Sequence, residues 1–189
     1  MKKKIALDLD GVVFDSENLY RVYTEIYDVD NLNGDNLVDN TKRIFQKRYN
    51  WQQEEFQKFY TEYSDEILSK ANLMPGADIV IPKLLKDFDI IIVTSRGDDE
   101  IKYATDKFDK INLEGVTIYN NEHHKIDRLI SEDVDYVIDD DIDICKNASL
   151  KGIKALYFKN NASEEVNNIN NLKTVHNWGE IYKFIMLNR

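Results

Sequence analysis

Short apolar runs separated by amphipathic stretches recur along most of the chain, and this alternation predicts strands that alternate with helices. The runs at 5–7 and 89–93 are continuously apolar, which is typical of strands buried on both faces of a parallel sheet. Further strands are expected at 116–119, 134–138, 153–158 and, as a marginal edge strand, 174–175. The pattern favours an α/β fold with a Rossmann-like parallel sheet, right-handed crossovers and helices on both faces.

Residues 16–72 interrupt this alternation. Apolar and aromatic residues recur there at helical spacing, which predicts helices over about 19–27 and 44–49 and a longer helix with Asn50 as its N-cap. The polar stretch 28–40 is expected to be a loop. We therefore predict an α/β core made of 1–15 and 73–189, and a small helical cap, 16–72, inserted after the first strand and placed over the mouth of the sheet.

Composition narrows the classes of function. The 189 residues carry a formal charge of −10, which makes the chain a poor candidate for binding duplex nucleic acid or an anionic membrane. Cys145 is the single cysteine, so neither an internal disulfide nor a cysteine-rich metal site can form. The N-terminal lysines precede too few apolar residues for a signal peptide, and no stretch approaches a membrane span. A cytoplasmic location is therefore expected.

Polar side chains stand at the carboxyl ends of three predicted strands. They are Asp8 and Asp10, Thr94 and Ser95, and Asp139 and Asp140, with Lys125 at the start of the helix before the third of these strands. Because parallel strands bring their carboxyl ends to one edge of a sheet, these groups should converge. Carboxylates beside a hydroxyl and an ammonium group suit a magnesium ion and a phosphoryl group.

Two carboxylates can divide the work of phosphoryl transfer. One can attack phosphorus and form an aspartyl-phosphate. The other can protonate the leaving oxygen and later deprotonate water. Magnesium would offset the negative charge that otherwise repels the nucleophile.

The sequence DLDGV at 8–12, Thr94 after DIIIV, Lys125, and Asp139-Asp140 after VDYVI together resemble the four motifs of the haloacid dehalogenase superfamily. The resemblance implies that Asp8 is the nucleophile and Asp10 the general acid and base. It implies that Thr94, Ser95 and Lys125 hold the phosphate. Magnesium would be bound by the Asp8 and Asp140 carboxylates and the Asp10 carbonyl, with Asp139 supporting them.

Within that superfamily, the position of the cap and the length of the chain resemble the 5′(3′)-deoxyribonucleotidase-like group and similar bacterial nucleotidases. This second resemblance implies a nucleoside monophosphate as substrate. A monomer or a homodimer is expected. Tyr20, Tyr49 and Trp51 could supply a stacking face for the base, and Arg96 could reach the substrate or cap its own loop.

Other functions stay open. The substrate could be another small phosphorylated metabolite, such as a sugar phosphate. A phospho-acceptor receiver module also uses strand-end acids, a hydroxyl and a lysine, but its lysine comes last, whereas Lys125 precedes the final acid pair. A non-catalytic relative should have lost a motif residue, and none is lost here.

Overall fold

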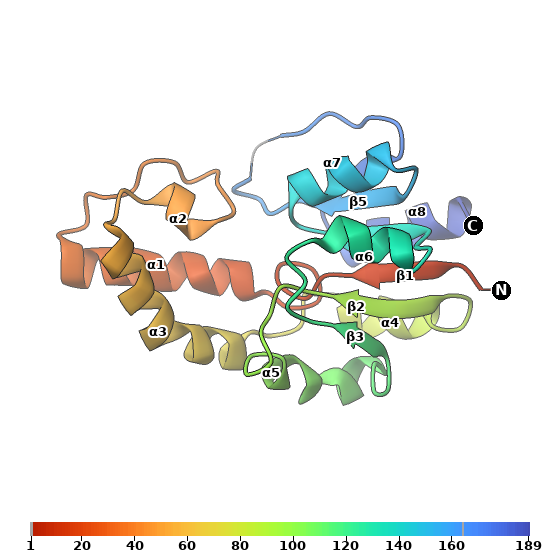
Figure 1. Ribbon diagram of the computed structural model, residues 1–189, viewed down its shortest axis with the longest axis horizontal. Helices are drawn as coiled ribbons and strands as arrows, with labels where there is room; N and C mark the ends of the chain where they lie inside the picture. Colours follow the sequence, from red (N-terminus) through yellow and green to blue (C-terminus); the bar gives the residue numbers. More distant parts are fainter. Residues whose placement is uncertain (1, 164) are drawn as a thin grey trace.

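The computed structural model, which describes residues 2–163 and 165–189, contains a six-stranded sheet in the order β3-β2-β1-β4-β5-β6, with every pairing parallel (Figure 1). The strands are β1 (Lys4–Leu7), β2 (Asp89–Val93), β3 (Thr117–Tyr119), β4 (Tyr136–Asp139), β5 (Lys154–Phe158) and β6 (Leu172–Val175). The predicted α/β fold with a parallel sheet is confirmed, and β6 forms the predicted edge strand.

Helices cover both faces of the sheet, and successive strand residues face opposite cores. Ile5 and Leu7 pack on one side and Ala6 on the other. The first side holds α4 (Ala77–Leu84), α5 (Lys102–Thr105), the 3₁₀ helix η1 (Phe108–Ile111) and α8 (Trp178–Leu187), and the second holds α6 (Lys125–Ser131) and α7 (Ile142–Leu150). Burial on both faces explains why the strand sequences are continuously apolar.

Three helices, α1 (Ser16–Leu32), α2 (Phe45–Arg48) and α3 (Gln53–Lys70), lie beyond the carboxyl ends of the strands (Figure 1). Aromatic rings hold them together: the ring centroid of Tyr27 lies 5.1 Å from that of Trp51 and 5.4 Å from that of Phe59. Most of the aromatic residues at helical spacing therefore form the core of this helical part.

Two local expectations are wrong. Helix α1 continues to Leu32, through the start of the predicted loop, because the buried Asp28 carboxylate is held by the indole N–H of Trp51. Helix α3 begins at Gln53 without a side-chain cap, so Asn50 is not its N-cap.

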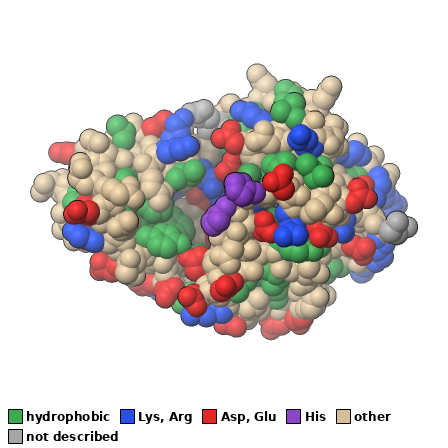
Figure 2. Space-filling view, in the orientation of Figure 1, with side chains coloured by type: hydrophobic (Ala, Val, Ile, Leu, Met, Phe, Trp, Pro, Cys, Tyr) green, Lys and Arg blue, Asp and Glu red, His purple; other side chains and the backbone are tan. Residues whose placement is uncertain are grey.

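The chain crosses between the sheet and the helical part twice, and the two crossings lie side by side. The Met74 amide donates to the Val13 carbonyl at 2.8 Å, and the Asp15 amide donates to the Asn72 carbonyl at 2.9 Å. The surface is indented between the two parts, and acidic side chains are spread over both (Figure 2). Among the described residues, no helix has both the length and the apolar character needed to cross a membrane.

Candidate active site

The carboxyl ends of the neighbouring strands β2, β1 and β4 bring the expected polar residues to one edge of the sheet. Thr94 follows β2, Asp8 follows β1 and Asp139 is the last residue of β4. Backbone pairing continues past β1, since the Asp8 amide donates to the Ile138 carbonyl at 3.0 Å. Strand register therefore fixes the distance between the first aspartate and the later acid pair.

Asp8 is almost fully buried, and its two oxygens have different partners. The Leu9 amide donates to Oδ1 at 2.8 Å, and the Lys125 ammonium lies 3.0 Å from Oδ2. The pKa of Asp8 is raised to about 6, chiefly by burial; Lys125 opposes the rise and Asp139 adds to it. Lys125 also donates to Asp139 at 2.8 Å, and these two carboxylates outweigh its burial and raise its pKa. Lys125 therefore stays charged between two acids.

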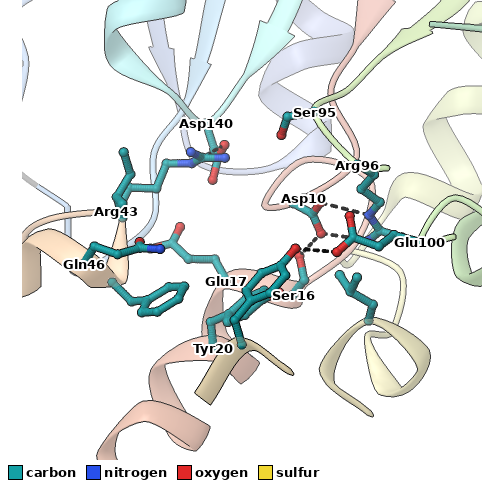
Figure 3. A pocket seen from close by; sticks show the side chains of 14 residues that line it. Asp10, Ser16, Glu17, Tyr20, Arg43, Gln46, Ser95, Arg96, Glu100 and Asp140 are labelled. Carbon is teal, nitrogen blue, oxygen red and sulfur yellow. Dashed lines mark hydrogen bonds and ion pairs between the residues drawn. The ribbon is translucent and has the colours of Figure 1, made fainter. Parts of the chain in front are cut away.

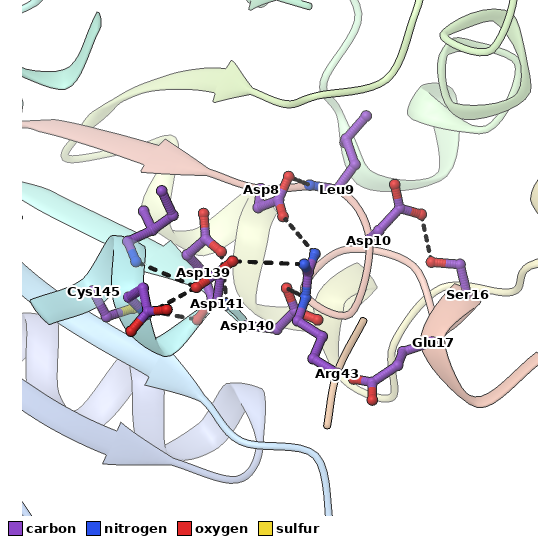
Figure 4. A network of polar contacts seen from close by, with 12 residues as sticks. Asp8, Leu9, Asp10, Ser16, Glu17, Arg43, Asp139, Asp140, Asp141 and Cys145 are labelled. Atoms are coloured by element: carbon purple, nitrogen blue, oxygen red, sulfur yellow. Dashed lines mark hydrogen bonds and ion pairs between the residues drawn. The ribbon is translucent and has the colours of Figure 1, made fainter. Parts of the chain in front are cut away.

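Asp8, Asp139 and Asp140 form a compact acidic cluster in which one oxygen from each lies within 4.8 Å of the others (Figure 4). Gly11 makes room for it. With φ at +74°, Gly11 has a backbone conformation that other residues rarely adopt, and a Cβ there would lie 2.2 Å from Asp140 Oδ2. Glycine in the loop after β1 thus allows Asp140 to approach Asp8.

The cluster fits a hard divalent cation. Both oxygens of Asp140 are buried and accept no well-formed hydrogen bond from the described residues, although Arg43 pairs with one of them. Burial raises the pKa of Asp140 well above its usual range, and Asp8 and Asp139 add to this against the opposing Arg43. Crowded oxygen ligands of this kind suit magnesium, while the assignment of Asp8 and Asp140 as its direct carboxylate ligands stays a prediction.

Asp10 points away from this cluster into the neighbouring pocket, where Arg96 and Ser16 hold it (Figure 3). Arg96 Nε donates to Oδ2 at 2.9 Å and Nη2 donates to Oδ1 at 2.7 Å, and the Ser16 hydroxyl also donates to Oδ1. Burial would raise the pKa of Asp10, but the Arg96 ion pair outweighs it and lowers the pKa. Arg96 therefore contacts the acid expected to act in proton transfer.

The two hydroxyl residues after β2 have different environments. Thr94 is fully buried, and its hydroxyl accepts a hydrogen bond from the Arg96 amide at 3.3 Å. Ser95 is exposed and lines the pocket. Both lie at the same sheet edge as Asp8, while their contact with phosphate stays a prediction.

The pocket lies between the strand ends and the three helices and encloses about 230 Å³. Tyr20 lines it and stacks almost parallel to Phe45, with ring centroids 5.8 Å apart. Tyr49 and Trp51 are placed differently: they are buried in the core of the helical part, with ring centroids 4.7 Å apart, and do not line this pocket. The structure therefore contradicts a stacking face that includes Tyr49 and Trp51, because the helices use these rings to pack against one another.

Arg43 is the main residue that the sequence reading did not single out. It lies in the segment between α1 and α2, and its Nε is 2.7 Å from Asp140 Oδ1. Its other nitrogens lie 3.9 Å from Asp8 Oδ2 and 3.7 Å from Asp141 Oδ2 (Figure 4). No spacing or motif marks Arg43 in the sequence, since it stands in a polar, irregular stretch. Its role depends on where the helical part places that stretch.

A second contact joins the helical part to the sheet at the pocket. The Tyr60 hydroxyl, on α3, donates to the Glu100 carboxylate, which lies in the segment between β2 and α5. The Gly97 amide donates to the other oxygen of Glu100 at 2.9 Å. Together with the Arg43 contacts, this contact shows that residues of both the sheet part and the helical part form the pocket.

Comparisons with known proteins identify the fold. No family model and no curated protein matches the chain. Among solved structures, a haloacid dehalogenase-like hydrolase from Streptococcus pneumoniae is similar over 97% of this chain and 98% of its own, with a TM-score of 0.72 and 18% identity. A provisionally named phosphoglycolate phosphatase from Lactobacillus plantarum gives a TM-score of 0.65 with 14% identity over 97% of this chain and 99% of its own.

A provisionally assigned hydrolase of the same type from Bacillus subtilis, bound to magnesium, gives a TM-score of 0.62 with 16% identity over 97% of this chain and 98% of its own. At these identities the similarity concerns the fold, and it extends over the sheet and the helical part together. The chain therefore has the fold of the haloacid dehalogenase-like hydrolases.

Proposed function

We propose that this protein is a magnesium-dependent phosphomonoester hydrolase that acts through an aspartyl-phosphate. The observation that carries the proposal is the buried Asp8, paired with Lys125 and adjacent to the Asp139 and Asp140 carboxylates at the strand ends. The four motifs and the fold of the similar hydrolases support the same conclusion.

The proposed reaction has two displacements. An Asp8 carboxylate oxygen forms a bond to phosphorus while the bond from phosphorus to the ester oxygen breaks, and Asp10 gives its proton to the leaving oxygen. Asp10 then takes a proton from water, whose oxygen attacks phosphorus and releases Asp8 and inorganic phosphate. The incoming dianion favours the protonated form of Asp10 in the first step, whereas Arg96 favours the ionised form needed in the second.

The chain's own cations hold the phosphoryl group in place. Lys125 is within 3.0 Å of Asp8 and can bind an oxygen of the phosphoryl group transferred to it. Thr94 and Ser95 are proposed to donate to further oxygens. Magnesium, held by Asp8, Asp140 and the Asp10 carbonyl, would offset the charge of the phosphate and of the surrounding carboxylates.

A nucleoside monophosphate is one candidate substrate. Tyr20 in the pocket wall supports this choice, since an aromatic ring can stack on a base. The cavity of about 230 Å³ is smaller than the roughly 300–1,000 Å³ typical of pockets for larger ligands, which equally supports a small sugar phosphate.

The test is hydrolysis of p-nitrophenyl phosphate and of a panel of mononucleotides and sugar phosphates, with magnesium and with EDTA. We expect magnesium-dependent release of phosphate, which Asp8→Asn abolishes without changing the circular dichroism spectrum. Asp78→Asn, an exposed substitution on α4, is the matched control and should keep the wild-type rate. Turnover by Asp8→Asn near the wild-type rate would contradict the covalent route. A stable phosphoaspartate without turnover would instead favour a phospho-acceptor module.

A further inference from the structure

More acidic than basic side chains line the pocket. Four are acids and two are bases: Asp10, Glu17, Glu100 and Asp140, against Arg43 and Arg96. By formal charge, the lining therefore has more acids than bases before a metal or substrate binds. A metal bound at Asp8 and Asp140 would reduce this excess at the phosphoryl end of the pocket, and leave the walls around the leaving group unchanged.

Both bases of the lining already have carboxylate partners. Arg96 makes two hydrogen bonds to Asp10, at 2.9 Å and 2.7 Å, and Arg43 Nε lies 2.7 Å from Asp140. Each partner belongs to the proposed reaction centre. Arg96 Nη1 has no hydrogen-bond partner, but it is buried, so within the described lining of the pocket each arginine is already paired with a carboxylate.

Glu17 is one of the acids in the lining, and neither lining arginine is its hydrogen-bond partner. It stands in the first turn of α1, is 7% exposed, and lines the pocket next to Gln46 and Arg43 (Figure 3). Arg21 supports it from outside the pocket lining, and both of its hydrogen bonds, at 3.0 Å and 2.7 Å, go to Oε1. This arrangement fixes the carboxylate and leaves Oε2 able to accept a hydrogen bond from a ligand.

Glu100 presents a second carboxylate to the pocket, from the sheet part of the molecule. The Gly97 amide and the Tyr60 hydroxyl hold its two oxygens, so it is fixed in place as well. Arg21 offsets part of the charge of Glu17, yet two fixed carboxylates in a partly enclosed pocket still repel an anion more strongly than exposed ones, because little solvent screens them. They attract hydroxyl or ammonium donors for the same reason.

We propose that Glu17, together with Glu100, restricts the site to phosphomonoesters whose alcohol has hydroxyl or ammonium donors and carries no second anionic group. The inference rests on the proposed phosphomonoesterase function and specifies its substrate class. It excludes phosphorylated carboxylic acids and bisphosphates, and it admits neutral polyols, amino alcohols and nucleosides.

Two esters that differ mainly in one group test this selectivity. Glycerol 3-phosphate ends in a hydroxymethyl group where 3-phosphoglycerate has a carboxylate. We expect the wild-type kcat/KM to be at least about tenfold higher for glycerol 3-phosphate, with most of the difference in KM, because like charges brought together in a site are strongly unfavourable. Similar values for the two esters would overturn the proposal.

Glu17→Gln tests whether Glu17 causes the selectivity. The variant loses the negative charge but keeps an oxygen that can accept from Arg21. The variant should bring the two kcat/KM values closer by about tenfold, through a lower KM for 3-phosphoglycerate at an unchanged kcat. Glu54→Gln, at an exposed position on α3, is the control and should leave the ratio as it is. A ratio that Glu17→Gln leaves unchanged would refute the role of Glu17.

Hydrolysis of p-nitrophenyl phosphate separates the two proposals. If the wild type hydrolyses it but shows no preference between the matched esters, the selectivity inference fails and the proposed function stands. If no ester is hydrolysed with magnesium present, the proposed function fails and the selectivity inference fails with it. The wild-type ratio is decisive even if Glu17→Gln does not fold.

Discussion

The sheet part and the helical part of this molecule position their functional side chains by different physical means. In the sheet, backbone hydrogen bonds between parallel strands fix the register, so Asp8 and Asp139 are placed by pairing that continues over several residues. In the helical part, packing among aromatic rings fixes the helices, and Glu17, Arg43 and Tyr60 reach the pocket from its surface.

This difference corresponds to a division between the residues proposed to react and the residues proposed to select the substrate. The groups proposed to react or to hold phosphate come from the sheet part: Asp8, Asp10, Thr94 and Lys125. The residues proposed to sort substrates come largely from the helical part. Substitutions in the sheet part should therefore act on kcat and on metal binding. Substitutions in the helical part should act on KM and stability, except at Arg43, which pairs with Asp140.

After the loss of turnover expected for Asp8→Asn, the largest expected effect tests the assignment of chemistry to the sheet. Asp10→Asn removes the group that protonates the leaving oxygen, so kcat should fall by about 10³-fold while KM changes little. Steady-state kinetics with glycerol 3-phosphate measures both constants. A large rise in KM at a preserved kcat would contradict the assignment of reacting groups to the sheet part, because it would indicate that Asp10 binds substrate and does not transfer a proton.

The raised pKa of Asp8 predicts a pH-dependent cost to stability in the metal-free protein. Because the folded pKa is about 6 and the ordinary value is 3.8, the folded state binds the proton more tightly, and the Asp8 contribution to stability falls as pH rises through this window. Asp8→Asn should relieve this cost, by up to about 3 kcal/mol at pH 7 and by little at pH 4.

Urea unfolding of both proteins in EDTA, from pH 4 to pH 7, measures the difference. Titrating groups that do not interact with Asp8 cancel in the comparison, whereas Asp140, whose pKa Asp8 helps to raise, adds to the difference in the same direction. A stability difference that stays constant with pH would refute the raised pKa of Asp8.

Magnesium should stabilise the folded protein through the acidic cluster. At a concentration of 100 times its Kd, a ligand that binds only the folded state adds about 2.7 kcal/mol to the free energy of unfolding. Asp140→Asn should lose most of this gain, whereas Asp78→Asn should keep it. Thermal unfolding with magnesium and with EDTA checks both variants. Full stabilisation of Asp140→Asn by magnesium would place the metal elsewhere.

Arg43 connects the two regions, and its substitution sharpens their comparison. The guanidinium pairs with the Asp140 carboxylate that would hold magnesium, so the two cations compete for it. Arg43→Gln should tighten magnesium binding by about fivefold, on the order of 1 kcal/mol. Isothermal titration with magnesium measures this, with Lys58→Gln on α3 as a control for loss of a positive charge. Unchanged or weaker magnesium affinity in Arg43→Gln would contradict the competition.

The smallest functional effect is expected at Trp51. Trp51→Phe loses the hydrogen bond to Asp28 and should lower the free energy of unfolding by about 1 kcal/mol. KM should not change, because Trp51 does not line the pocket, whereas Tyr20→Leu should raise KM. A higher KM in Trp51→Phe would contradict this prediction and indicate that the Trp51 ring takes part in substrate binding.

The same contrast explains what could be predicted from the sequence. Continuous apolar runs marked the strands, and parallel topology then implied that Asp8, Lys125 and the acid pair at 139–140 would meet at one sheet edge. The structure brings these four residues together, while their catalytic roles stay predictions.

Side chains placed by tertiary packing had no comparable signal. Helical spacing cannot distinguish an aromatic ring that packs between helices, such as Trp51, from one that lines a pocket, such as Tyr20. Arg43 lies in an irregular segment whose path depends on contacts distant in sequence. Arg96 follows the second strand, but its pairing with Asp10 depends on the conformation of two loops.

Gly11 affects the site through the absence of a side chain, which leaves room for Asp140. It offers no charge and no side-chain ligand atom, yet one added methyl group would lie 2.2 Å from an Asp140 oxygen and clash with it. A search for reactive groups alone would pass over this position, although a change there would disable the neighbouring carboxylate without removing any reactive group.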